Sequence, residues 1–121
     1  MVRGIRGATT VIEDQESMIF EATVELLSAM IVGNQLDSTA VASLFITVSP
    51  DLRSAFPAKA VRAVPGWDLV PLMCAVEVDV PGSLSRCIRL LLHVNTDAEQ
   101  RDIRHMYLRD AIQLRPDLSQ S

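Results

Sequence analysis

Arg89 stands within the run 87–92, Cys-Ile-Arg-Leu-Leu-Leu, which is otherwise apolar and typical of a buried β-strand. Because side chains alternate between the two faces of a strand, Arg89 shares a face with Cys87 and Leu91. A guanidinium that leaves water without a partner is strongly destabilising, so a buried one is either paired or binds an anion. Two interpretations therefore fit: an internal ion pair with a carboxylate such as Glu77, or a cationic site for an anionic ligand.

Two other segments place cations where an anion that carries a ring could bind. Arg6 shares its strand face with Gly4, whose missing side chain leaves room for a ligand; the alternative is an exposed arginine on a strand. Phe56, Lys59 and Arg62 follow one another at three-residue steps and so lie roughly on one helical face. That face either completes a site with one aromatic ring and two cations, or is a solvated helix surface.

Cys74 and Glu77 belong to the segment 72–77 and fall on opposite faces of an ideal strand. Without a β-bulge they cannot both line one pocket of a single chain, but they can serve two pockets at subunit interfaces. No nearby sequence feature supplies an activating base for Cys74, which is expected to be a buried structural thiol. Glu77 needs a partner, either Arg89 or a ligand hydroxyl. Tyr107, the only tyrosine, is expected to be half-buried with its hydroxyl at the edge.

Composition excludes several classes of function. The 121 residues, with a formal net charge of −4, suit one domain that is neither a general nucleic-acid binder nor an anionic-membrane binder. The sequence contains no phosphate-binding glycine loop, dinucleotide fingerprint, paired-carboxylate signature or metal-ligand spacing. We therefore expect no metal, no cofactor and no membrane partner. The cytoplasm is the default compartment. Of the eleven basic residues all but Lys59 are arginines, which bind carboxylates through a planar fork and suit a small dianion; the alternative is compositional bias.

These residues must be positioned by a small α+β domain. Helical spacing of apolar residues predicts a helix over 15–32, with Asp14 as its N-cap. Four strands are expected, at 2–11, 41–48, 69–78 and 87–94. A short helix is expected at 57–63, and one or two further short strands are expected within 105–114. The expected architecture is a mixed sheet covered on one face by one long helix, with a flexible tail at about 115–121.

Five separated motifs, in order along the whole chain, resemble one known family. They are Val-Arg-Gly-Ile-Arg-Gly-Ala-Thr-Thr at 2–10, Ser-Ala-Phe-Pro-Ala-Lys-Ala-Val-Arg at 54–62, Ile-Arg at 88–89, Ile-Arg-His-Met-Tyr-Leu at 103–108 and Leu-Arg-Pro-Asp-Leu at 114–118. Together they are similar to the monofunctional, trimeric α/β class of chorismate mutases, as distinct from the all-helical class with the same activity. This resemblance implies an isomerase that converts chorismate to prephenate, on the route to phenylalanine and tyrosine.

The resemblance also implies a homotrimer in which three sheets form a pseudo-α/β-barrel with the helices outside. The three active sites would lie between neighbouring subunits. One subunit would contribute Arg89 at the ether oxygen, Arg6 and Tyr107 at a carboxylate, and Glu77 at the ring hydroxyl. The next subunit would contribute a second set of residues: Phe56, Lys59, Arg62, Met73 and Cys74, with Cys74 also at the ring hydroxyl. Leu114 and Arg115 would belong to a tail that orders over the pocket.

The implied reaction is a rearrangement of one substrate, in which no proton moves and no covalent intermediate forms. It would depend on orientation and on a fixed cation, with Arg89, Arg6 and Glu77 as the catalytic residues. Met73 departs from the family, because a threonine is common there in relatives; a contribution through the backbone would survive this change. Two alternatives remain: a non-catalytic trimeric module that binds a small dicarboxylate or aromatic metabolite, and another small trimeric α/β enzyme such as an imine deaminase.

Overall fold

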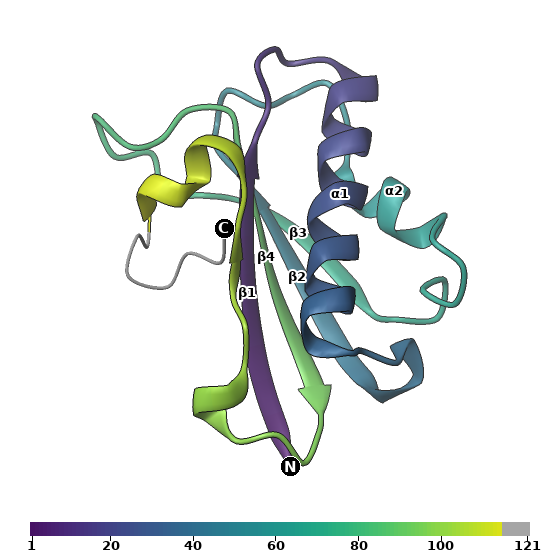
Figure 1. Cartoon of the computed structure of the whole chain (residues 1–121). Coiled ribbons are helices and arrows are strands. Elements are labelled where there is room, and N and C mark those ends of the chain that lie inside the picture. The colour runs from purple at the N-terminus through teal and green to yellow at the C-terminus, as the bar shows by residue number, and fades with distance from the viewer. Residues whose placement is uncertain (115–121) are drawn as a thin grey trace.

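The computed structural model describes residues 1–114 and consists of one five-stranded sheet with helices on one side (Figure 1). Its strands occur in the spatial order β3-β2-β4-β1-β5. The bounds are β1 (Val2–Thr10), β2 (Val41–Val48), β3 (Leu72–Val76), β4 (Cys87–Asn95) and β5 (Met106–Tyr107). Strand β4 is antiparallel to both its neighbours, β1 and β2, whereas β3 and β5 pair in parallel at the two edges. The sheet is therefore mixed, as predicted, and β4 is its central strand.

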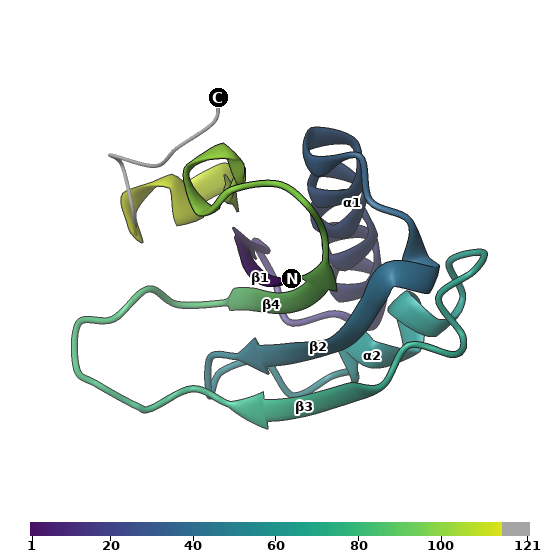
Figure 2. The ribbon, with the colours of Figure 1, turned by 90° about the horizontal axis from the view of Figure 1, so that it is seen from below.

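Two α-helices cover one face of this sheet, and the other face carries no α-helix from residues 1–114 (Figure 2). The long helix α1 (Glu16–Asn34) lies along β1, and the short helix α2 (Pro57–Arg62) lies beside it. A Cβ atom added at Gly7 of β1 would come within 2.6 Å of the Met30 sulfur, so this glycine allows α1 to approach the strand closely. Short 3-10 turns occupy three further segments: Ser38–Ala40, Gln100–Asp102 and Arg109–Leu114.

Alternation along the strands separates the core from the open face. Large apolar side chains of β1, β2 and β4 face the helices and are fully buried: Ile5, Leu44, Ile46, Ile88, Leu90 and Leu92. They pack against the apolar side of α1, where Leu26 and Met30 are fully buried. The intervening residues of the same strands face the other way, among them Arg6 and Arg89. The sequence pattern of period two is thus the direct cause of a face that carries chemistry.

The long helix, the first two strands and the central strand lie where the pattern predicted them, but three details were wrong. Asp14 does not cap α1, because Gln15 is the N-cap residue and makes no side-chain cap. The Asp14 carboxylate instead accepts hydrogen bonds from the backbone amides of Arg53 and Ser54, at 3.0 and 3.1 Å. The segment 105–114 contains only the two-residue strand β5, followed by a 3-10 turn, and the third strand is shorter than expected.

Thr9 offers a test of how the core is packed. It is fully buried, and its Oγ1 has no hydrogen-bond partner within residues 1–114. A buried, unpaired hydroxyl costs about 1–3 kcal/mol, whereas valine has the same shape without it. We expect Thr9→Val to raise the free energy of unfolding by about 1 kcal/mol, measured by urea denaturation at one protein concentration. A clear loss of stability would show instead that the hydroxyl is satisfied in solution.

Candidate active site

Strand register places the chemically active side chains in a row across the open face of the sheet. Ala8 of β1 pairs with Tyr107 of β5 on one side and with Arg89 of β4 on the other. Arg89 pairs in turn with Thr47 of β2. The small Ala8 side chain between two large ones leaves a hollow in the open face. The guanidinium of Arg89, the phenol of Tyr107 and the hydroxyl of Thr47 surround this hollow.

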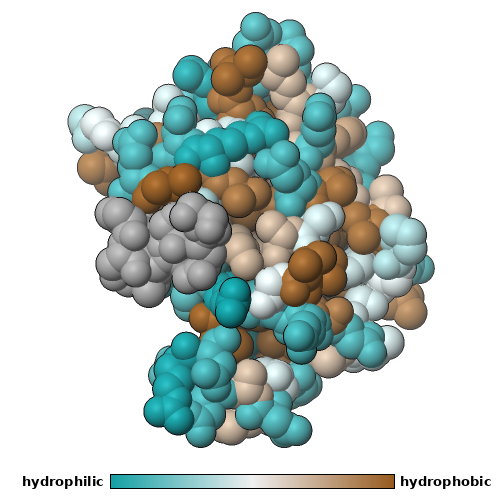
Figure 3. Space-filling view, viewed as in Figure 1, coloured by the Kyte–Doolittle hydropathy of each residue, from teal (hydrophilic) through white to brown (hydrophobic). Residues whose placement is uncertain are grey.

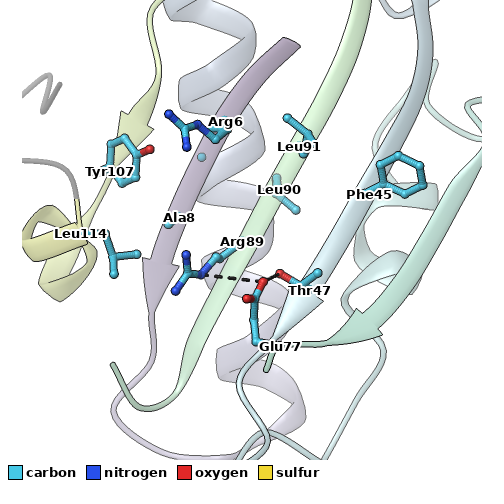
Figure 4. A pocket seen from close by; sticks show the side chains of 11 residues that line it. Arg6, Ala8, Phe45, Thr47, Glu77, Arg89, Leu90, Leu91, Tyr107 and Leu114 are labelled. Atoms are coloured by element: carbon cyan, nitrogen blue, oxygen red, sulfur yellow. Dashed lines mark hydrogen bonds and ion pairs between the residues drawn. The ribbon is translucent and has the colours of Figure 1, made fainter. Parts of the chain in front are cut away.

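This hollow is a cavity of about 320 Å³ (Figure 4). It draws residues from all five strands or their ends, and the lining includes Arg6, Ala8, Phe45, Thr47, Glu77, Arg89, Leu91, Tyr107 and Leu114. Phe45 and Leu91 supply apolar walls beside the two arginines. A pocket that is partly apolar and carries a few convergent polar groups is typical of a small-molecule site.

Arg89 and Glu77 form a long ion pair inside the cavity. The distance from Arg89 Nε to Glu77 Oε2 is 3.8 Å, which exceeds hydrogen-bond range. Arg89 Nε is itself a buried atom with no hydrogen-bond partner among residues 1–114. The two side chains are 40% and 31% exposed, toward the cavity. Arg89 therefore lies beside an internal carboxylate, as the first interpretation predicted, and also lines an open cavity, which the second interpretation requires.

The Glu77 carboxylate is held by β2. Thr47 Oγ1 donates a hydrogen bond to Glu77 Oε2, the same oxygen that lies nearest Arg89. The Glu77 backbone amide donates to the Val48 carbonyl at 2.9 Å, which extends the pairing of β2 with β3 by one residue. Glu77 thus follows the last residue of β3 and does not occupy a position inside it.

Arg6 and Tyr107 lie at the β5 side of the cavity. The Arg6 backbone amide donates to His105 Nδ1 at 2.9 Å, so a histidine just before β5 continues the hydrogen bonding between β1 and β5. Tyr107 as a whole residue is 5% exposed, less than expected, and in Figure 4 its hydroxyl points toward β1. An exposed guanidinium and a fixed phenol here are suitable donors to a ligand carboxylate.

Phe56, Lys59 and Cys74 line a second cavity, of about 390 Å³, which shares none of its lining residues with the first. Cys74 and Glu77 therefore serve different cavities, as their opposite strand faces predicted. The expectation that Cys74 is buried was wrong, because it lies on the edge strand β3 and is exposed. The buried thiol is Cys87. Burial raises the pKa of this thiol, although the positive charge of Arg89 acts to lower it.

The comparisons with known proteins decide the family. A family model described as chorismate mutase type I matches residues 2–118. The chain belongs to the chorismate mutase type I family. It is 48% identical to "Chorismate mutase AroH" of Bacillus subtilis over 119 residues, which are 98% of this chain and 94% of that protein. It is 54% identical to "Chorismate mutase AroH" of Thermus thermophilus over 119 residues, which are 98% of this chain and 97% of that protein.

The fold is shared with a solved member of the same family. The structure titled "Chorismate mutase from Clostridium thermocellum Cth-682" has a TM-score of 0.88 and 47% sequence identity, and the match covers 90% of this chain and 96% of that one. The α+β fold class and the resemblance to the α/β class of chorismate mutases are both confirmed. So is the expectation of an isomerase with chorismate mutase function.

The site residues predicted for this chorismate mutase fall into three groups. Those expected from one subunit line the first cavity together: Arg6, Glu77, Arg89 and Tyr107, with Leu114 at the end of the described chain. Of those expected from the next subunit, three line the second cavity, whereas Arg62 and Met73 line neither of these two cavities. Met73 is exposed on β3. Arg115 and the expected tail lie outside the described residues.

Several lining residues were not identified from the sequence, and Thr47 and Phe45 are the two whose side chains matter most here. Thr47 and Phe45 alternate with the buried residues of β2, so strand periodicity already placed them on the open face. What periodicity could not reveal was the register that sets Thr47 beside Arg89. A threonine and a phenylalanine in an apolar strand are too common to indicate a site without that neighbour.

Proposed function

We propose that this chain rearranges chorismate to prephenate in a site built from the first cavity of one subunit and the second cavity of its neighbour. The observation that carries the proposal is Arg89, a guanidinium on the central strand with its Nε unpaired within residues 1–114 and open space beside it. Chorismate is a dianion, and the cavity offers it two guanidinium groups, a phenol and apolar walls.

The reaction requires orientation and charge, and the residues of the cavity can supply both. Arg6 and Tyr107 would bind carboxylate and hold the enolpyruvyl arm over the ring, an entropic contribution to the rate. Arg89 would face the ether oxygen, where negative charge grows as the carbon–oxygen bond breaks. A cation fixed on the central strand does not reorganise during the reaction, which is why it stabilises the transition state more than the ground state. Glu77 would accept a hydrogen bond from the ring hydroxyl.

A homotrimer would bring the two cavities together. Within one chain the residues of the second cavity are separate from those of the first, so neither cavity alone holds all the predicted ligands. Large apolar side chains are also exposed on the open face and along the β3 side of the sheet, among them Phe45, Met73, Val76 and Val78. Hydrophobic patches also interrupt the hydrophilic surface in the space-filling view (Figure 3). A head-to-tail ring would bury such surfaces and form one shared site at each interface.

A direct assay tests the proposed reaction. Purified protein is mixed with chorismate, and the loss of its ultraviolet absorbance is followed together with product analysis. We expect rapid conversion with prephenate as the sole product and without added metal or cofactor. Stable chorismate under these conditions would favour the binding-module alternative, in which the cavity holds its ligand unchanged. Size measurement in solution tests the trimer separately from the activity.

The product places the enzyme on the route to phenylalanine and tyrosine, and we propose the cytoplasm as its compartment. Within residues 1–114, none of the helices combines the length and apolar character needed to cross a membrane.

A further inference from the structure

We infer that Thr47 is a positioning residue, whose hydroxyl holds the Glu77 carboxylate so that it does not close onto Arg89. The guanidinium then stays available to the substrate. This inference rests on the proposed function, because it assigns a purpose to Arg89 that only a bound anion would need. Thr47 lines the cavity itself, but the role inferred here is exercised through the Glu77 carboxylate.

The backbone sets Thr47 between the two partners. Thr47 is paired with Arg89 of β4 on one side and with Ala75 of β3 on the other. Because Glu77 lies two residues beyond Ala75, its side chain emerges on the same face of the sheet. The Glu77 amide is tied to the Val48 carbonyl, so two successive residues of β2 hold Glu77, one by its backbone and one by its carboxylate. Figure 4 shows Thr47 and Glu77 together at the edge of the cavity, beside Arg89.

The hydrogen bonds around Glu77 indicate what this hydroxyl does. A hydroxyl has one proton to donate, and Thr47 gives it to Glu77 Oε2. That oxygen is the one nearest the guanidinium, yet it stays 3.8 Å from Arg89 Nε, which has no hydrogen-bond partner within residues 1–114. Carboxylate and guanidinium groups otherwise form close, often bidentate, charge-assisted pairs. The geometry is therefore that of a carboxylate restrained short of a closed ion pair.

A closed pair would oppose catalysis in two ways. It would offset the positive charge that has to stabilise the developing oxyanion, and it would occupy donor atoms of the guanidinium that are needed to bind an anion. It would also turn the Glu77 oxygens away from a ligand hydroxyl. A hydroxyl partner satisfies one carboxylate oxygen without neutralising its charge, so Glu77 stays in place and Arg89 stays cationic toward the cavity.

The experiment compares two substitutions at Thr47 with a matched control. Thr47→Val removes the hydroxyl and keeps the shape, whereas Thr47→Ser keeps the hydroxyl. Thr9→Val makes the same change on β1, at a side chain buried in the core and outside the lining of either cavity. For chorismate turnover we expect Thr47→Val to lower kcat by about 10-fold or more, Thr47→Ser to stay within about threefold of wild type, and Thr9→Val to match wild type.

A double-mutant cycle separates positioning from other roles. If Thr47 acts through Glu77, then Thr47→Val costs nothing further when it is added to Glu77→Ala. The inference is overturned if the loss is the same in both backgrounds, or if Thr47→Ser is as poor as Thr47→Val. Thermal unfolding of each variant checks that the fold is retained. Failure of the proposed function is distinguishable, because wild-type protein would then leave chorismate unchanged.

Discussion

Replacing Arg89 with alanine is expected to lower kcat for chorismate by at least about 10²–10³-fold, the usual loss when a preorganised donor to a developing oxyanion is removed. The change takes away the cation that faces the cavity from the central strand. Glu77 keeps its hydrogen bond from Thr47 and remains partly exposed, so the loss of its distant partner should cost the fold little. Steady-state kinetics and thermal unfolding measured on the same preparation check both parts.

Two controls show whether charge is the cause. Arg101→Ala removes an arginine whose side chain is 82% exposed and which pairs with Glu99 outside both cavities, and it should leave turnover unchanged. A neutral urea isostere of arginine, introduced at position 89, keeps the shape and most of the hydrogen bonding without the charge. We expect it to be nearly as poor as alanine. Near-full activity of the isostere would show that shape and not charge drives the reaction.

Mixing two inactive variants is expected to restore about one-quarter of wild-type activity, because each site of the proposed oligomer would take one cavity from each of two neighbours. Arg89→Ala damages the first cavity, whereas Lys59→Glu puts a negative charge in the second cavity, where a dianion should bind. In a randomly assembled 1:1 mixture, half of the subunits supply an intact first cavity and the other half an intact second one. Rates at chorismate concentrations well below KM, before and after joint refolding, provide the measurement.

The matched control pairs two variants of the same cavity. A mixture of Arg89→Ala with Glu77→Ala contains no subunit with an intact first cavity, so joint refolding should restore nothing. Native mass spectrometry verifies that mixed oligomers have formed in both experiments. If mixed oligomers form and the first mixture is no more active than the average of its parents, each chain carries a complete site and the shared-site proposal is wrong.

The alternation of residue types along each strand correctly predicted which face of the sheet its side chains occupy. This works because each strand must bury one of its own two faces, whichever strands lie beside it. The alternation along 87–92 placed Arg89 on the face opposite the core residues Ile88 and Leu90, and both of these are fully buried. The same reasoning put Cys74 and Glu77 on opposite faces, and in the structure Glu77 lines the first cavity whereas Cys74 lines the second. It could not show that Cys74 is exposed, because exposure depends on whether β3 lies at the edge or the centre of the sheet.

Two predictions from local sequence were wrong, the helix cap at Asp14 and the strand length around Tyr107. Asp14 has the right type and position for an N-cap, but its carboxylate accepts hydrogen bonds from the amides of 53–54, residues that are distant in sequence. Apolar residues near Tyr107 suggested longer strands than the two residues that pair with β1. For Asp14 a contact made by folding competed with the local preference, and sequence spacing contains no information about that contact.

Residue type and local period were enough to predict the mixed α+β architecture and the strand faces on which Arg89 and Arg6 lie, and the resemblance of five motifs was enough to indicate the family. They were not enough to align Tyr107, Ala8, Arg89 and Thr47 in one row, because packing between distant segments sets the order and register of the strands. The folded sheet was also needed to show that Glu77 stops short of a closed pair with Arg89. Such a distance reflects the balance of backbone pairing, a hydroxyl bond and charge, and these act together only once the strands have assembled.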